Sequence, residues 1–159
     1  MNADLARLLA ELFTVPKTLA LGVVLEGAPY LGLLPFAVSA DRTTAYVHVS
    51  RLARHTAGLS RGARVCALLH LEPSSVPDAL QIPRLILSGV AEPLDPGSPE
   101  YKPARALYEE RFPGMSATFS LGDFVFVALR FERGRLVSGF AKVRDLTAAD
   151  LVPERTESA

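Results

Sequence analysis

The chain has 159 residues, of which 49% are hydrophobic, and its 17 basic residues balance its 17 acidic ones. This length suits one domain with a substantial core, and the balanced charge argues against a disordered chain or a general nucleic-acid binder. No apolar run approaches the roughly 20 residues needed to cross a membrane. We therefore expect a cytoplasmic protein with neither a membrane nor a nucleic-acid partner.

The first fifty residues predict one helix and three strands. Leucines repeat at helical spacing near the N-terminus, at Leu5, Leu8, Leu9 and Leu12. This pattern predicts an amphipathic helix that ends before Pro16. Strand-forming residues then fill the segment 17–50, with turn residues at 27–29 and 39–42.

The middle of the chain predicts two apolar strands. The first covers residues 63–71 and contains the single cysteine, Cys66, which we expect to be a small buried core residue. The second covers residues 80–94, where Gly89 indicates a close approach of two backbones.

The last third predicts a helix and a hairpin. The helix begins with Ser98 as its N-cap and closes at Pro113. Two strands are then expected around a turn at residues 132–134. Mostly short turns between six or seven strands favour an antiparallel barrel over a parallel α/β sheet.

The stretch "YVHVSRLARHTAGL", Tyr46 to Leu59, is the strongest candidate for a binding site. A strand ends at Ser50, and a helix is expected over residues 51–59 with Leu52 and Leu59 on its core face. Unpaired backbone N–H groups at a helix start attract anions. Side chains that would help to hold a phosphate are Ser50, Arg51, His55 and Thr56, with Arg51 and His55 one helical turn apart.

The same stretch has a plain structural explanation, and the residues alone do not decide between the two. Ser50 would then only cap the helix, and the arginines would only face water. Between Arg42 and Leu71 there are five arginines and no acidic residue, which is compatible with either explanation.

Other chemical motifs are missing from the sequence. It has no glycine-rich nucleotide fingerprint, no Walker loop and no HExxH spacing, so we expect no metal site. A nucleophile pair of Ser50 with His48 or His55 lacks the GxSxG elbow. No catalytic residue is identified.

The segment from "GAPYLGLLPFAVSADRTTAYVHVSRLARHTAGL" to "SLGDFVFVALRFERGRLVSGFAKV" resembles the pyridoxamine 5'-phosphate oxidase-like, FMN-binding split-barrel family, in particular its HugZ-related branch. The likeness covers roughly residues 8–145 of a single domain spanning 1–159, with a C-terminal tail at 147–159. It implies a mainly β (α+β) fold, a six- to seven-stranded antiparallel split β-barrel with two to four peripheral helices. In "GFAKV", Ala141 stands where that branch has glycine.

The resemblance implies that FMN binds in a groove between two protomers of a homodimer. Residues expected to line the groove are Pro35, Phe36, Ala37, Val38, Tyr46, Val47, His48 and Arg84, with Phe140 and Lys142 reaching in from the other chain. Those expected around the phosphate are Ser50, Arg51, Leu52, His55 and Thr56. A homodimer also follows from the long apolar strands, unless the helices cover them.

The implied activity is that of a flavin-dependent oxidoreductase of unknown substrate. The alternatives are a haem-binding or haem-degrading protein on the same fold, and a flavin-binding dimer without turnover. The sequence has no histidine after His70, which argues against vitamin B6 oxidation. It also leaves the C-terminal segment without an axial haem ligand, so haem breakdown is not expected as the main activity.

Overall fold

The computed structural model describes residues 1–153. Its helices are α1 (Ala3–Thr14), α2 (Tyr101–Arg111) and α3 (Ala148–Leu151). Its strands are β1 (Thr18–Leu25), β2 (Ala28–Pro35), β3 (Ala37–Val38), β4 (Thr44–Ser50), β5 (Arg64–His70), β6 (Arg84–Pro93), β7 (Phe124–Gly139) and β8 (Lys142–Thr147). Short 3-10 helices cover Arg54–Gly58, Pro73–Ser75, Ala79–Gln81 and Pro113–Ser120.

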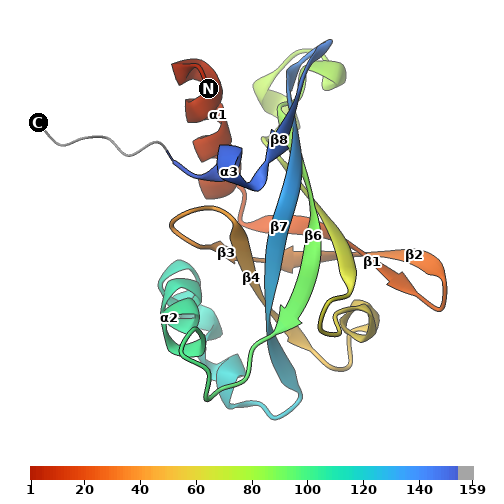
Figure 1. Ribbon diagram of the computed structural model, residues 1–159, viewed down its shortest axis with the longest axis vertical. Coiled ribbons are helices and arrows are strands. Elements are labelled where there is room, and N and C mark those ends of the chain that lie inside the picture. The colour runs from red at the N-terminus through yellow and green to blue at the C-terminus, as the bar shows by residue number, and fades with distance from the viewer. Residues whose placement is uncertain (154–159) are drawn as a thin grey trace, which may run out of the picture.

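The strands form one curled antiparallel sheet, a split barrel with a few helices around it (Figure 1). The strand order is β2-β1-β5-β6-β7-β4-β3, and β8 pairs with β7 beside this path. The expected α+β split barrel is confirmed. The described residues form eight strands, because the chain leaves the sheet at Phe36 and divides one expected strand into β2 and β3. No described helix is long and apolar enough to span a bilayer.

The main core fills the concave side of the sheet. The N-terminal helix α1 begins at the N-cap Asn2, whose side chain accepts a hydrogen bond from the Leu5 backbone N–H, and it ends before Pro16 as expected. Its buried residues Leu9 and Phe13 pack with alternate residues of the strands, such as Leu21. The apolar face of the helix, with its period of 3.6 residues, and the inward-facing residues of the strands, with their period of 2, thus form one core.

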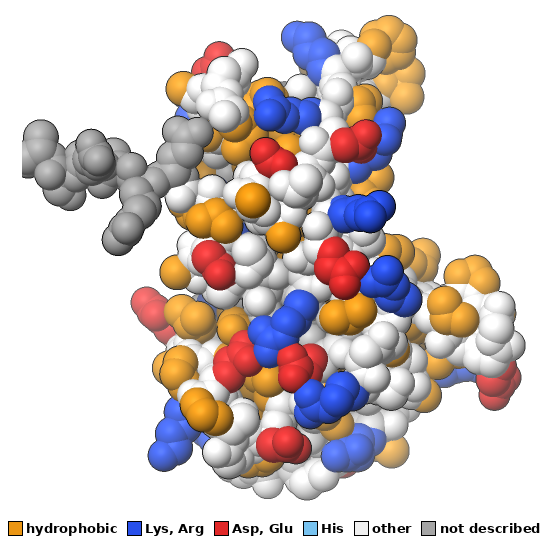
Figure 2. Space-filling view, viewed as in Figure 1, with side chains coloured by type: hydrophobic (Ala, Val, Ile, Leu, Met, Phe, Trp, Pro, Cys, Tyr) orange, Lys and Arg blue, Asp and Glu red, His pale blue; other side chains and the backbone are white. Residues whose placement is uncertain are grey.

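A second apolar cluster joins α2 to the outer face of β3, β4 and β7. It is built from buried aromatic and small residues: Ala37, Tyr46, Leu94, Ala104, Tyr108, Phe126 and Ala128. Arg130 on β7 binds Glu100, the N-cap residue of α2, and Glu92 on β6 through its guanidinium. Figure 2 shows basic and acidic side chains alternating on this part of the surface. These contacts fix α2 against one half of the outer face and leave the other half uncovered.

Two expectations about β7 and β6 have opposite outcomes. The predicted turn at residues 132–134 is wrong, because β7 runs unbroken through Gly134, which pairs with Leu87 on one side and Leu146 on the other. The hairpin turn lies instead between β7 and β8, where Ala141 has φ +57°. The close approach at Gly89 is confirmed, since a Cβ there would lie 1.8 Å from the Arg130 carbonyl oxygen.

Three smaller expectations need correction. Cys66 is exposed, because it points to the outer face of β5 while Val65 and Ala67 point into the core. Helix α2 begins at Tyr101, with Glu100 rather than Ser98 as its N-cap residue. The predicted C-terminal tail starts with the short helix α3, and residues 154–159 lie outside the described part of the chain.

Candidate functional site

The strand β4 ends at Ser50, and hydrogen bonds hold the chain in a tight turn there. Ser50 Oγ accepts a hydrogen bond from the Leu52 backbone N–H at 3.1 Å and donates one to Asp123 Oδ2 at 3.1 Å. The Thr56 hydroxyl donates to the Ser50 carbonyl oxygen at 2.6 Å. The turn thus brings together two of the hydroxyl groups predicted to surround a phosphate.

The expected helix over residues 51–59 is reduced to the 3-10 helix Arg54–Gly58. Leu52 is 86% exposed and does not form a core face, whereas Leu59 is buried. Arg51 precedes the helix and is exposed, so the one-turn spacing of Arg51 and His55 does not apply. The Arg51 backbone N–H donates to the Asp123 carbonyl oxygen at 2.6 Å, and its guanidinium forms no ion pair within the described residues.

The ring of His55 fits closely against the neighbouring strand β2. A Cβ on Gly32 would lie 2.8 Å from His55 Nδ1, so only glycine allows this approach. His55 Nε2 is buried and has no hydrogen-bond partner in the described part of the chain. Burial also lowers the pKa of His55. A buried ring nitrogen without a partner is unusual and indicates a place where a ligand atom would be stabilised.

Tyr46 and His48, predicted on the flavin's path, lie under α2. The His48 ring stacks on Phe119 with the centroids 3.8 Å apart, and its Nδ1 lies 2.9 Å from Thr118 Oγ1. The Tyr46 hydroxyl donates to Glu100 Oε1 at 2.9 Å. Both side chains are under 10% exposed, and Val47 between them is buried in the main core.

The predicted groove segment 35–38 runs beside β4, and Ala37 pairs with Tyr46 as expected for a neighbouring strand. Its Phe36 is buried in the main core and contacts the guanidinium of Arg111, which lies 4.9 Å from the ring centroid. Pro35 and Val38 are half-buried at the ends of β2 and β3.

Arg84, Phe140 and Lys142 lie far from the Ser50 turn within one chain. Arg84 begins β6 and donates to the Ile82 carbonyl oxygen at 3.1 Å. Phe140 and Lys142 belong to the β7–β8 hairpin, at the opposite end of the molecule from the 3-10 helix Arg54–Gly58 (Figure 1). Only a second chain would bring these residues to the turn, and that part of the expectation stays a prediction.

Two residues of the site were missed by the sequence reasoning. Asp123 is 73 residues away from Ser50, and the pairing of Ser50 with Phe124 between β4 and β7 brings it there. Gly32 lies in an ordinary strand and carries no local motif. Glycine in an apolar strand is a sign of close approach, and that signal was available at Gly32. No local pattern pointed to Asp123.

The described residues contain no group of three or more His, Cys, Asp or Glu side chains able to hold a metal ion. The site therefore offers an arginine, an imidazole and two hydroxyl groups around one turn, with one carboxylate beside them. That set suits an anion such as a phosphate, provided that Ser50 turns its hydroxyl away from Asp123.

Comparison of the sequence with family models and with curated proteins finds no match. Solved structures match over nearly the whole chain. A heme binding protein from Mycobacterium smegmatis is 24% identical with a TM-score of 0.77, over 92% of this chain and 60% of that one. HutZ, a heme storage protein from Vibrio cholerae, is 24% identical with a TM-score of 0.67, over 81% and 88%.

A protein from Clostridium acetobutylicum related to general stress protein 26, of the pyridoxinephosphate oxidase family, is 16% identical with a TM-score of 0.67. The match covers 95% of this chain and 99% of the Clostridium protein. The chain spans about three fifths of the length of the Mycobacterium protein.

The chain thus has the fold of the pyridoxamine 5'-phosphate oxidase-like split-barrel proteins. Proteins with this fold include the haem-binding ones among its structural neighbours and the general stress protein relatives. At these identities the likeness is one of fold, and the ligand has to be argued from the residues of this chain.

Proposed function

We propose that this protein binds FMN, with the phosphate held at the Ser50 turn by Ser50, Arg51, His55 and Thr56. The observation that supports this most strongly is the buried Nε2 of His55, which has no hydrogen-bond partner among the described residues. The Ser50 and Thr56 hydroxyls and Arg51, which forms no ion pair with the described residues, belong to the same turn. A phosphate at this place would accept hydrogen bonds from the Arg51 guanidinium and from a protonated His55 Nε2, and from the Ser50 and Thr56 hydroxyls once these turn away from Asp123 and from the Ser50 carbonyl oxygen. Hydrogen bonds to a charged group contribute about 1.5–3 kcal/mol each.

We propose that the protein is a homodimer and that the uncovered half of the outer face is its interface. Exposed apolar side chains lie there on three strands: Val24 on β1, Leu31 and Leu33 on β2, and Ile86 on β6. Ala20 on β1 pairs with both Leu33 and Leu68, and Leu68 pairs with Ile86, so these positions form a continuous row across four strands. An apolar patch of this kind on a protein surface commonly marks an interface.

In this proposal a second chain also completes the flavin groove. Tyr30 and Gly32 on β2 flank the 3-10 helix Arg54–Gly58, with the Arg54 guanidinium 5.7 Å from the Tyr30 ring centroid. Tyr30 and Gly32 pair with Val23 and Leu21 of the main core, so the phosphate turn packs on the core side of β2, the edge strand of the sheet, opposite Leu31 and Leu33. A second chain packed on the outer face would have to extend around the edge strand β2 to supply the other wall of the groove.

With FMN bound, the flavin would supply the redox chemistry, and the activity proposed is that of a flavin-dependent oxidoreductase. The protein's own part is to hold the phosphate, orient the ring and exclude water. The described site contains no acid–base pair directed at a reacting atom, so a flavin-binding dimer without turnover is the alternative within this proposal.

A second candidate ligand is haem. The names of two structural neighbours, a heme binding protein and a heme storage protein, favour it. The absorption spectrum of the protein as purified separates the candidates. The two visible bands of a flavin support FMN binding, whereas a Soret band without them favours haem. A colourless protein that takes up neither ligand would overturn both.

A further inference from the structure

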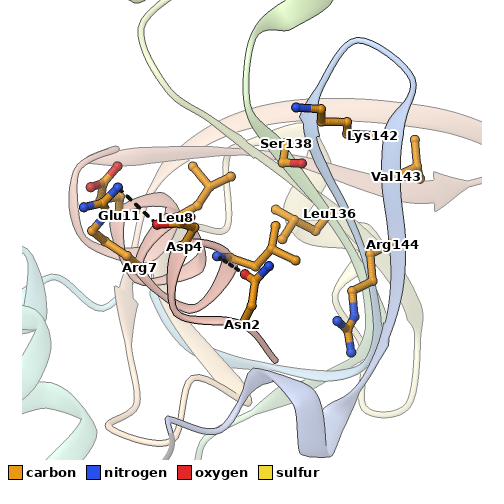
Figure 3. A pocket seen from close by; sticks show the side chains of 11 residues that line it. Asn2, Asp4, Arg7, Leu8, Glu11, Leu136, Ser138, Lys142, Val143 and Arg144 are labelled. Atoms are coloured by element: carbon orange, nitrogen blue, oxygen red, sulfur yellow. Dashed lines mark hydrogen bonds and ion pairs between the residues drawn. The ribbon is translucent and has the colours of Figure 1, made fainter.

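A large cavity lies between α1 and the β7–β8 hairpin, away from the Ser50 turn (Figure 3). Its volume is about 810 Å³, within the range of about 300–1,000 Å³ typical of small-molecule sites. Leu5 and Leu8 of α1 and Leu136 of β7 supply apolar lining. The β7–β8 hairpin extends past the ends of the other strands, and α1 lies opposite this extension (Figure 1).

One wall of this cavity carries two basic side chains, and the charge of one of them, Arg144, adds to the hydrogen bonds that lower the pKa of the Asp150 carboxyl. Lys142 and Arg144 are two residues apart on β8 and so share one face of the strand. Their cross-strand neighbours are Gly139 and Leu136, and Leu136 lines the same cavity. Neither basic side chain forms a hydrogen bond or an ion pair with the described residues, and Figure 3 shows both at the edge of the cavity.

The opposite wall, on α1, carries one net negative charge. On α1, Arg7 lies 3.7 Å from Asp4 and compensates its charge, which leaves Glu11 in the last turn of the helix. Of the five charged side chains that line the cavity, three are basic. Glu11 on α1 and Lys142 and Arg144 on β8 form no ion pair with the described residues, so the unpaired basic side chains are both on β8. A negative group would therefore be attracted to the β8 wall.

We propose that this cavity binds a small amphipathic carboxylate, with its apolar part over Leu5, Leu8 and Leu136 and its carboxylate at Lys142 and Arg144. The hydroxyl of Ser138, which also lines the cavity, supplies a further donor. The leucines favour a ligand with an apolar part over a fully polar anion such as free phosphate, and the net negative charge of α1 leaves the β8 wall as the end that holds the carboxylate.

The test uses octanoate and its uncharged counterpart octanol as probes of the full chain, by titration calorimetry. We expect octanoate to bind at one site per chain and at least about fivefold more tightly than octanol. Arg144→Ala should weaken octanoate binding about three- to fivefold, as expected for an exposed charge pair, and leave octanol binding unchanged. Arg133→Ala, which removes an exposed arginine outside the cavity, should change neither.

Backbone amide shifts in NMR spectra locate the probe independently of any variant. Octanoate should shift the amides of Leu8, Ser138 and Val143. Shifts confined to the β1–β2 hairpin and β5 would overturn the proposal, as would equal binding of octanoate and octanol. This proposal and the flavin proposal can fail independently. FMN titration of Arg144→Ala tests the Ser50 turn, whereas the octanoate experiments test only the cavity.

Discussion

Acidification should destabilise this protein through His48, before most of its carboxylates titrate. The ring is 7% exposed and lies among Phe119, Phe126 and Tyr108. Burial lowers the pKa of His48 from 6.5 to about 4, and the positive charge of Arg105 adds to this effect. The folded chain therefore keeps His48 neutral at a pH where the unfolded chain already binds a proton.

The sign and size of the effect follow from these two pKa values. The stability due to neutral His48 is fully present above pH 6.5 and is lost as the pH falls towards 4. At about 1.4 kcal/mol for each pH unit between the two values, the free energy of unfolding falls by about 2 kcal/mol at pH 5 and about 3 kcal/mol at pH 4.

Urea unfolding of the wild type and His48→Phe, at several pH values between 7 and 4.5, measures this directly. Phenylalanine keeps the stacking on Phe119 but does not titrate, so its free energy of unfolding should be nearly constant down to pH 5. NMR titration of the His48 ring gives the pKa even if the variant folds poorly. Equal pH slopes for the two proteins, or a measured pKa near 6.5, would refute the reasoning.

Three further predictions concern the hairpin, the phosphate turn and the interface. Ala141→Gly should raise the free energy of unfolding by about 0.5–1 kcal/mol, since φ +57° is strained for alanine; thermal unfolding measures it, and a loss of stability would contradict it. Arg51→Ala should weaken FMN binding by about 1.5 kcal/mol, whereas Asp123→Asn should strengthen it about two- to fivefold by removing a negative charge beside the phosphate; unchanged affinities in fluorescence titrations would contradict both. Leu33→Glu should convert the dimer to a monomer in light scattering and speed the reaction of Cys66 with thiol reagents; a wild type that is monomeric at every concentration would contradict the interface.

The parts of the fold that could be predicted from the sequence are those with a clear repeat or a clear breaker. The leucines of α1 and the alternating residues of β1 and β5 have the right periods, and Pro16 ends the first helix. Gly89 also gave a correct signal, because glycine in an apolar strand leaves room for another backbone.

The errors have physical causes that no local pattern reveals. Glu132-Arg133-Gly134 has the composition of a turn, yet it is strand, because β6 and β8 pair with β7 on its two sides. The segment 51–59 has a helical pattern, but the Ser50 hydrogen bonds hold its first residues in a turn. Tertiary contacts override the local preference in both cases.

The candidate site was predicted in part for the same reason. The strand, the serine and the basic residues are contiguous in sequence, so their chemistry is visible there. Asp123 and Gly32 come from distant strands, and the covering of His48 depends on where α2 packs. These features depend on which strands pair and in which register, and the local sequence of one strand does not specify its pairing with a distant strand.

The central claim is that a phosphate binds at the Ser50 turn, and the most direct measurement compares two flavins that differ only in that phosphate. The ligand-free protein is titrated with FMN and with riboflavin, and flavin fluorescence is followed at equilibrium. The account predicts that FMN binds at least about tenfold more tightly, because hydrogen bonds to the charged phosphate are missing in riboflavin. Equal affinities for the two flavins would contradict it.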